Sequence, residues 1–218
     1  MTDVKIVIGN KNYSSWSLRG WLALKQTGVP FEEALILLDT PQMHEEILAH
    51  SAAGRVPVVI DGDITVWDSL AIVEYLAERF PDAGLWPQDT AARAHARAIV
   101  AEMHSGFTGV RSHYPMNIRR VPAERPHDAQ AARDVARILA IWNEARARFG
   151  AGGDFLYGAF SAADAFYAPV VSRFVTYKVP VDDVTRAYMD AVMAHPSMKE
   201  WCEAGRAEPW IVEADEVD

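Results

Sequence analysis

The chain has 218 residues, 50% of them hydrophobic and 23% charged, and a formal net charge of -9. This composition is typical of a globular protein, and the acidic excess argues against general nucleic-acid binding, which depends on neutralising phosphates. Because Cys202 is the single cysteine, an intrachain disulfide and a zinc site of several cysteines are excluded, and we expect no metal. Without a charged leader or the ~20 apolar residues of a membrane span, we expect a cytoplasmic protein with no membrane contact.

The first third of the chain alternates short apolar runs with amphipathic segments. Apolar residues in unbroken runs of about four predict strands, and apolar residues three or four apart predict helices. The pattern predicts, in chain order, a strand over 4–8, a helix over 17–27, a strand over 31–37, a helix over 42–50, a hairpin of strands over 58–60 and 64–67, and a helix over 69–80. The order β-α-β-α-β-β-α favours a small mixed sheet with helices on its faces.

The remainder of the chain shows no strand pattern. Two prolines and a glycine over 81–89 indicate a linker. Ala- and Arg-rich segments with helical spacing follow over 90–112, 128–149, 161–177, 181–195 and 197–205. We therefore expect an α/β domain over 1–81, a linker over 82–89 and an all-α domain over 90–218.

Serines gather where the first strand meets the first helix. Ser14 and Ser15 lie at the expected helix start, beside unpaired backbone N–H groups and the positive end of the helix dipole. Such a place stabilises an anion, including a thiolate. Serines at a helix start are also ordinary caps, so the position alone leaves both interpretations open.

Three further motifs stand at the ends of predicted elements. Pro57 opens a buried strand, where either a trans proline at a strand edge or a cis bond after Val56 is possible. Asp68 and Ser69 open the helix over 69–80, where one of them caps the helix and the pair could hold an amine and a carboxylate. Ser161 and Asp164 predict a capping box with a buried, structural aspartate.

Taken together, these motifs resemble the cytosolic glutathione S-transferases over nearly the whole chain. The resemblance implies a thioredoxin-like N-terminal domain, an all-α C-terminal domain, glutathione as co-substrate, a small-molecule electrophile and a homodimer. The run Ser14-Ser15-Trp16-Ser17-Leu18-Arg19 is most similar to the zeta class. Trp16 stands where that class carries cysteine, which argues against the isomerase activity of the class.

The resemblance also implies roles for individual residues. Ser14, or its neighbour Ser15, would hydrogen-bond the glutathione sulfur. The other residues expected to bind glutathione are Trp16, Gln42, Arg55, Val56, Pro57 (in a cis bond), Asp68 and Ser69. A zeta-type cis-trans isomerase and a non-catalytic glutathione-binding protein are the alternatives.

A second pocket would lie between the two domains. His104, Phe107, Arg111 and Tyr114 are spaced three or four residues apart, which predicts that they share one face of the helix over 90–112. Phe107 and Tyr114 would supply apolar walls, and His104 or Arg111 would meet an anionic electrophile. A stripe in the core or at a dimer interface is the other interpretation.

Overall fold

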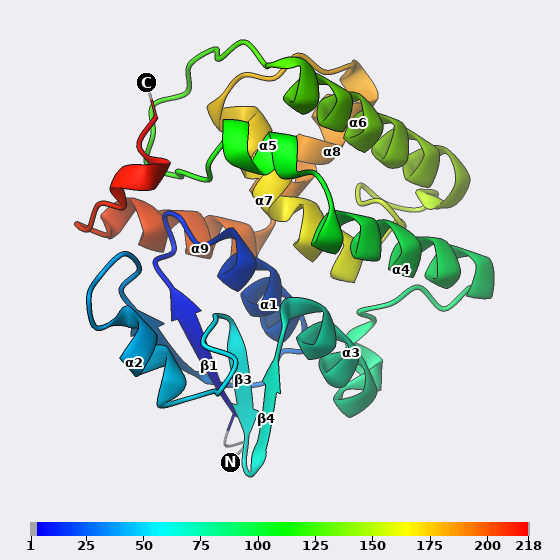
Figure 1. Ribbon diagram of the computed structural model, residues 1–218. Helices are drawn as coiled ribbons and strands as arrows, with labels where there is room; N and C mark the ends of the chain where they lie inside the picture. The colour runs from blue at the N-terminus through cyan, green and yellow to red at the C-terminus, as the bar shows by residue number, and fades with distance from the viewer. Residues whose placement is uncertain (1–3, 218) are drawn as a thin grey trace.

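The computed structural model describes residues 4–217 and begins with a small mixed sheet (Figure 1). Its described strands are β1 (Val4–Gly9), β2 (Glu32–Ile36), β3 (Val58–Asp61) and β4 (Ile64–Trp67), in the order β2-β1-β3-β4. β2 runs parallel to β1, whereas β3 is antiparallel to both β1 and β4. β1 is a central strand, so apolar side chains cover both its faces.

The helices of this first half lie on the two faces of the sheet. They are α1 (Ser15–Gln26), α2 (Met43–Leu48) and α3 (Ser69–Arg79), followed by the short 3-10 helix η1 (Pro81–Ala83). Ile6 and Ile8 of β1 belong to the large core cluster with α1 and α3, while Val7 packs with Ile47 of α2 in a second cluster. This alternation follows the two-residue period of a strand. The predicted order β-α-β-α-β-β-α is confirmed.

The second half is helical. Its described helices are α4 (Thr90–Ser105), α5 (Thr108–His113), α6 (Ala129–Phe149), α7 (Ala162–Thr176), α8 (Asp183–Ala194) and α9 (Pro196–Ala207), and the 3-10 helix η2 (Glu213–Asp215) follows. None of the helices within residues 4–217 has the length and apolar character needed to cross a membrane.

The predicted single helix over 90–112 is wrong, because the chain breaks between α4 and α5. Gly106 leaves the helix in an extended conformation, and Phe107 has a φ of +58°. A Cβ at position 106 would lie only 2.8 Å from the carbonyl oxygen of Glu102, which explains why glycine stands at the break. His104 and Arg111 therefore lie on different helices.

α7 is the central helix of this half and is buried on almost every side. Its start is held by Ser161 and Asp164, which form a capping box. The buried Asp164 carboxylate accepts the N–H groups of Leu156 at 3.1 Å and Ser161 at 2.8 Å, and the Ser161 hydroxyl at 2.9 Å. These bonds tie the loop before α7 to its first turn.

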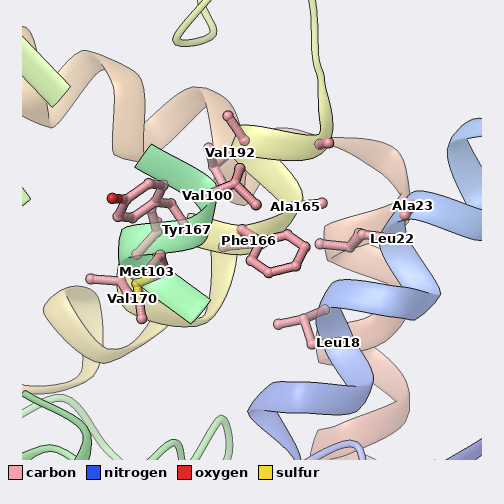
Figure 2. Packing of buried hydrophobic residues seen from close by; sticks show 14 of the residues in the cluster. Leu18, Leu22, Ala23, Val100, Met103, Ala165, Phe166, Tyr167, Val170 and Val192 are labelled. Atoms are coloured by element: carbon pink, nitrogen blue, oxygen red, sulfur yellow. The ribbon is translucent and has the colours of Figure 1, made fainter. Parts of the chain in front are cut away.

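The two halves meet where α1 packs against α7. Figure 2 shows Leu18 and Leu22 of α1 pointing toward Phe166 of α7, with Met103 of α4 on the other side of that ring. All four side chains are fully buried or nearly so and belong to one cluster that runs from β1 to α9. One hydrophobic core therefore serves both halves of the described chain.

Candidate functional site

A cavity of about 840 Å³ opens between the two halves. Its walls come from the start of α1, the loop before β3, the turn into α3 and the far end of the helical half. The predicted site residues that line it are Ser14, Ser15, Trp16, Arg55, Val56, Pro57, Asp68, Ser69 and Arg111. Residues that are distant in sequence are thus brought together in one place.

The serine wall is organised by the first turn of α1. Ser14 is the N-cap of this helix, and its Oγ accepts the backbone N–H of Ser17 at 3.4 Å. The Oγ atoms of Ser14 and Ser17 lie 2.7 Å apart, and Ser17 Oγ also accepts the N–H of Gly9 at 3.0 Å. As placed, the Ser14 hydroxyl donates to Ser17 Oγ. Because each hydroxyl carries one proton and two lone pairs, rotation of both hydroxyls would let Ser17 donate to Ser14 and free the Ser14 proton for a ligand.

The second wall is the loop that leads into β3. The Val56–Pro57 peptide bond is cis, and α1 packs directly on the proline ring. Gly20 permits this close approach, since a Cβ there would lie 3.0 Å from Pro57 Cγ. Val56 lies two residues before Val58, the first residue of β3, so its backbone lies outside the paired ladder.

The third wall is the start of α3. Asp68 is the N-cap with a φ of +49°, and its Oδ1 accepts the N–H of Leu70 at 2.8 Å. Its Oδ2 lies 3.2 Å from Nε2 of His104 on α4. Ser69 is only 1% exposed, and its Oγ has no hydrogen-bond partner among the described residues. A buried hydroxyl without a partner at a helix N-terminus is a ready donor for an anionic group.

The helical half contributes two guanidinium groups to the cavity wall, and Arg19 of α1 adds a third charge nearby. Arg111 of α5 and Arg173 of α7 line it, and both the Arg111 and the Arg19 guanidinium stand over the Trp16 ring, at 4.6 and 4.2 Å from its centroid. Burial lowers the pKa of Arg19 well below its ordinary value, and burial together with Arg111 lowers the pKa of Arg173 to about 10. Positive charge is therefore concentrated beside Trp16.

The segment after α9 closes one side of the cavity. Asp215 lines it, and burial raises the pKa of this carboxyl group. The neighbouring Glu216 accepts the Tyr13 hydroxyl at 2.5 Å, and Arg119 lies 3.9 Å from the same carboxylate. Figure 1 shows this segment lying beside α9. No cluster of three or more potential metal ligands occurs within residues 4–217.

The remaining predicted site residues lie outside the lining. Gln42 precedes α2 and makes no capping bond with its side chain. Phe107 is buried at the α4–α5 break, and the Tyr114 hydroxyl donates to the carbonyl oxygen of Arg125 at 2.9 Å. The expectation that His104, Phe107, Arg111 and Tyr114 share one helix face is wrong, because the break at Phe107 turns α5 away from α4.

Sequence reasoning missed Arg173 and Asp215. Arg173 carries a signal that could have been used, since it is the one cation in a mostly apolar helix that runs from Ala162 to Thr176, and buried arginines are rare without a partner. No sequence signal marks Asp215, because it lies in an acidic segment whose path beside the cavity depends on the tertiary fold.

Comparison with known proteins places this site in a family. The model of the glutathione S-transferase N-terminal domain matches residues 13–79, and the model of the C-terminal domain matches residues 128–204. The first match includes the serines, the cis-proline loop and the start of α3. The second covers α6 to α8 and most of α9.

Individual relatives agree with these matches. A Caenorhabditis elegans protein named "Probable maleylacetoacetate isomerase" is 41% identical over 94 residues, 43% of this chain and 42% of that relative. "Glutathione S-transferase Z1" of Arabidopsis thaliana is 31% identical over 121 residues, 53% of each chain. The matched regions thus span about half of the relatives' length or less.

A solved structure extends the likeness to the fold of the whole chain. The glutathione transferase homologue from Burkholderia gl BGR1, solved with bound glutathione, superposes with a TM-score of 0.70 at 24% identity, over 95% of this chain and 100% of that one. The expected combination of a thioredoxin-like α/β half and an all-α half is confirmed. The chain belongs to the glutathione S-transferase family.

Proposed function

We propose that the chain is a glutathione transferase, which binds glutathione in the cavity between its halves and transfers the thiolate to an electrophilic small molecule. The observation that carries this proposal is the convergence of the α1 serines, the Val56–Pro57 loop and the Asp68–Ser69 turn on one cavity of about 840 Å³. These elements offer, side by side, a hydroxyl for sulfur, a free backbone edge for a peptide and a carboxylate–hydroxyl pair for an amino-acid end.

The serine wall supplies the chemistry. A free thiol has a pKa of about 8.5, and lowering it by two units requires about 2.7 kcal/mol of preferential thiolate stabilisation. One hydrogen bond to a charged group contributes about 1.5–3 kcal/mol, and a helix N-terminus adds about 0.3–1 kcal/mol. We assign the donor to Ser14, whose hydroxyl is supported by Ser17, with Ser15 as the neighbouring alternative. The activation needs no separate base.

The other walls would hold the rest of the tripeptide. Val56 would pair its backbone with the cysteinyl part, in the manner of an added strand. Asp68 would hold the α-ammonium of the γ-glutamyl end, and the unpartnered Ser69 hydroxyl would hold its carboxylate. Arg55 and Gln42 would serve the glycyl end, with Arg55 already in the lining.

Membership in the family extends the proposal to assembly and location. We infer a cytoplasmic homodimer in which the sheet half of one chain meets the helical half of its partner. We also keep the division into domains over 1–81 and 90–218, with a linker over 82–89, as part of the proposal. Sedimentation equilibrium of the purified chain tests the dimer.

A glutathione-dependent cis-trans isomerase is the second candidate, favoured by the likeness to the probable maleylacetoacetate isomerase and to glutathione S-transferase Z1. The motif retains both serines, but Trp16 stands where the zeta class has cysteine. A bulky ring at this position narrows the space beside the sulfur. We therefore rank transfer above isomerisation.

The deciding experiment is an ultraviolet titration of glutathione bound to the protein. A transferase gives a thiolate absorbance with a midpoint about two pH units below that of free glutathione, and the Ser14→Ala variant binds glutathione while losing this shift. A non-catalytic glutathione-binding protein would bind the tripeptide with an unshifted thiol. Calorimetry that detects no glutathione binding would contradict the proposal altogether.

A further inference from the structure

We propose that the electrophile taken by this cavity carries a carboxylate, and that the buried guanidinium of Arg173 binds it. This inference rests on the proposed transferase function and adds to it the chemical class of the second substrate. It also assigns a specificity-determining role to a residue that lies far in sequence from the serine motif.

Arg173 is built into the wall of the cavity. Only 4% of the residue is exposed, and it projects from α7, the most deeply buried helix of the chain. Its Nε donates to the carbonyl oxygen of Tyr114 at 2.6 Å, which fixes the side chain in place. Nη1 is buried and has no partner among the described residues. One edge of the guanidinium fork is therefore held, while a donor at the other end is unused.

Arg173 lies in a region with an excess of positive charge. Arg111, also in the lining, donates from Nη2 to the carbonyl oxygens of Met103 and His104, and its Nε is unpartnered. All three guanidinium nitrogens of Arg19, behind Trp16, are buried and unpartnered as well. None of these three arginines is in an ion pair with a described residue.

Two carboxylates face this region, and neither satisfies Arg173. Asp215 lines the cavity and attracts Arg173 electrostatically without forming an ion pair within 4 Å. Asp68 accepts the N–H of Leu70, lies beside His104 and forms no ion pair with Arg173. Burying a guanidinium without an anion is unfavourable, and a planar carboxylate matches the geometry of its donors. A ligand carboxylate would supply the missing partner.

The binding test uses an unreactive pair of ligands, 3,5-dinitrobenzoate and 3,5-dinitrobenzamide, and isothermal titration calorimetry. The wild-type protein should bind the acid about 10- to 100-fold more tightly than the amide, the range expected for a charge-assisted hydrogen bond. Arg173→Met should abolish this preference. Arg137→Met, which removes an exposed arginine paired with Glu102 far from the cavity lining, is the matched control and should retain it.

The kinetic test uses the corresponding reactive pair, 4-chloro-3,5-dinitrobenzoate and its amide. In each reaction the glutathione thiolate forms a carbon–sulfur bond at the chlorinated ring carbon, the carbon–chlorine bond breaks, and chloride leaves with the bonding electrons. The thiol proton passes to solvent. We expect the ratio of kcat/KM for acid over amide to fall about 10- to 100-fold in Arg173→Met.

A second variant keeps the test decisive if Arg173→Met does not fold. Asp215, in the segment after α9, competes with the ligand carboxylate for Arg173. Asp215→Asn removes this competitor and should strengthen binding of the acid roughly threefold, while binding of the amide should not become stronger. Equal affinities of the wild-type protein for acid and amide would overturn the proposal. So would an Arg173→Met variant that weakens glutathione as much as it weakens the acid, because the arginine would then serve glutathione.

The two sets of measurements separate this inference from the proposed function. One outcome is Arg173-dependent preference for 3,5-dinitrobenzoate with no turnover of either chlorinated substrate. This outcome would support the anion site and would refute the transferase. Turnover of both chlorinated substrates without any preference for the acid would support the transferase and would refute the anion site.

Discussion

Oδ2 of Asp68, at the start of α3, lies 3.2 Å from Nε2 of His104 on α4, so this carboxylate touches both halves of the molecule. Burial lowers the pKa of His104 even though Asp68 raises it, which favours the neutral imidazole, whose Nε2–H can donate to the carboxylate. The arrangement holds Asp68 in place while its negative charge stays available to a ligand ammonium.

We predict that Asp68→Asn raises the KM for glutathione about 10-fold or more, because a charge-assisted hydrogen bond to the ammonium is lost. The free energy of unfolding should change little, since asparagine caps helices as well as aspartate does and tolerates a positive φ. Steady-state kinetics with varied glutathione measures the effect. Asp89→Asn, at the N-cap of α4 and outside the cavity, is the matched control. Similar KM values for both variants would contradict the role of Asp68.

Ser14→Ala should raise the pKa of bound glutathione by about one to two units, the equivalent of one charged hydrogen bond. The variant also loses the α1 cap, at a cost of about 1 kcal/mol in stability, which urea unfolding records separately. Ser105→Ala, an exposed serine at the end of α4, is the control. If the pKa of bound glutathione in Ser14→Ala matched that of the wild type and rose in Ser15→Ala, the role would belong to Ser15.

Ser17→Ala should act through Ser14. Its removal leaves the buried N–H of Gly9 without its acceptor, so we expect a loss of about 1–3 kcal/mol in the free energy of unfolding. It also removes the hydroxyl that supports Ser14, so the pKa of bound glutathione should rise by less than in Ser14→Ala. Ser172→Ala, a buried serine on α7, controls for the general effect of losing a buried hydroxyl. An unchanged thiol titration in Ser17→Ala would limit Ser17 to a structural role.

Asp164 should make stability depend on pH in an unusual direction. Burial raises the pKa of this carboxyl group to about 6, despite the hydrogen bonds that it accepts. Between about pH 4 and pH 6 the folded state therefore retains a proton that the unfolded state has released, and stability falls as the pH rises.

The measurement is urea unfolding of wild-type and Asp164→Asn proteins across this range. The stability advantage of the wild type over the variant should shrink by roughly 2–3 kcal/mol from pH 4 to pH 6 and stay level above it. Asp182→Asn provides a contrast of opposite sign, because the N–H of Thr185 lowers the pKa of the exposed Asp182, so its contribution is lost as the pH falls. A constant difference between wild type and Asp164→Asn would contradict the prediction.

Much of the first half could be predicted from the sequence, because its apolar runs are short, regular and bounded by turn residues. Val58 and Val59 in β3, for example, are fully buried as their pattern indicates. The Asp68–Ser69 turn was recognised through local chemistry, since a helix start needs a cap wherever it occurs. Such features depend on neighbours in the chain.

The helical half was harder to predict for physical reasons. Alanine-rich spacing continues across Gly106 and Phe107, so a helix break with a positive φ leaves little trace in the apolar pattern. The mostly apolar sequence around Arg173 hints at burial, but the place of its guanidinium in the cavity wall depends on how α7 packs among the other helices. The position of Asp215 depends on contacts of its neighbour with Tyr13, about 200 residues earlier in the chain. Each of these features is decided by tertiary packing.

The apolar core that the two halves share determines how the protein denatures. The Leu18, Leu22 and Phe166 side chains that join α1 to α7 belong to the same apolar cluster as the centre of each half. Separating the halves would expose that cluster to water at a large cost in free energy. Scanning calorimetry of the whole chain should therefore record a single endotherm whose calorimetric and van't Hoff enthalpies agree. Neither half is then an independent cooperative unit, although each contributes its own wall to the cavity.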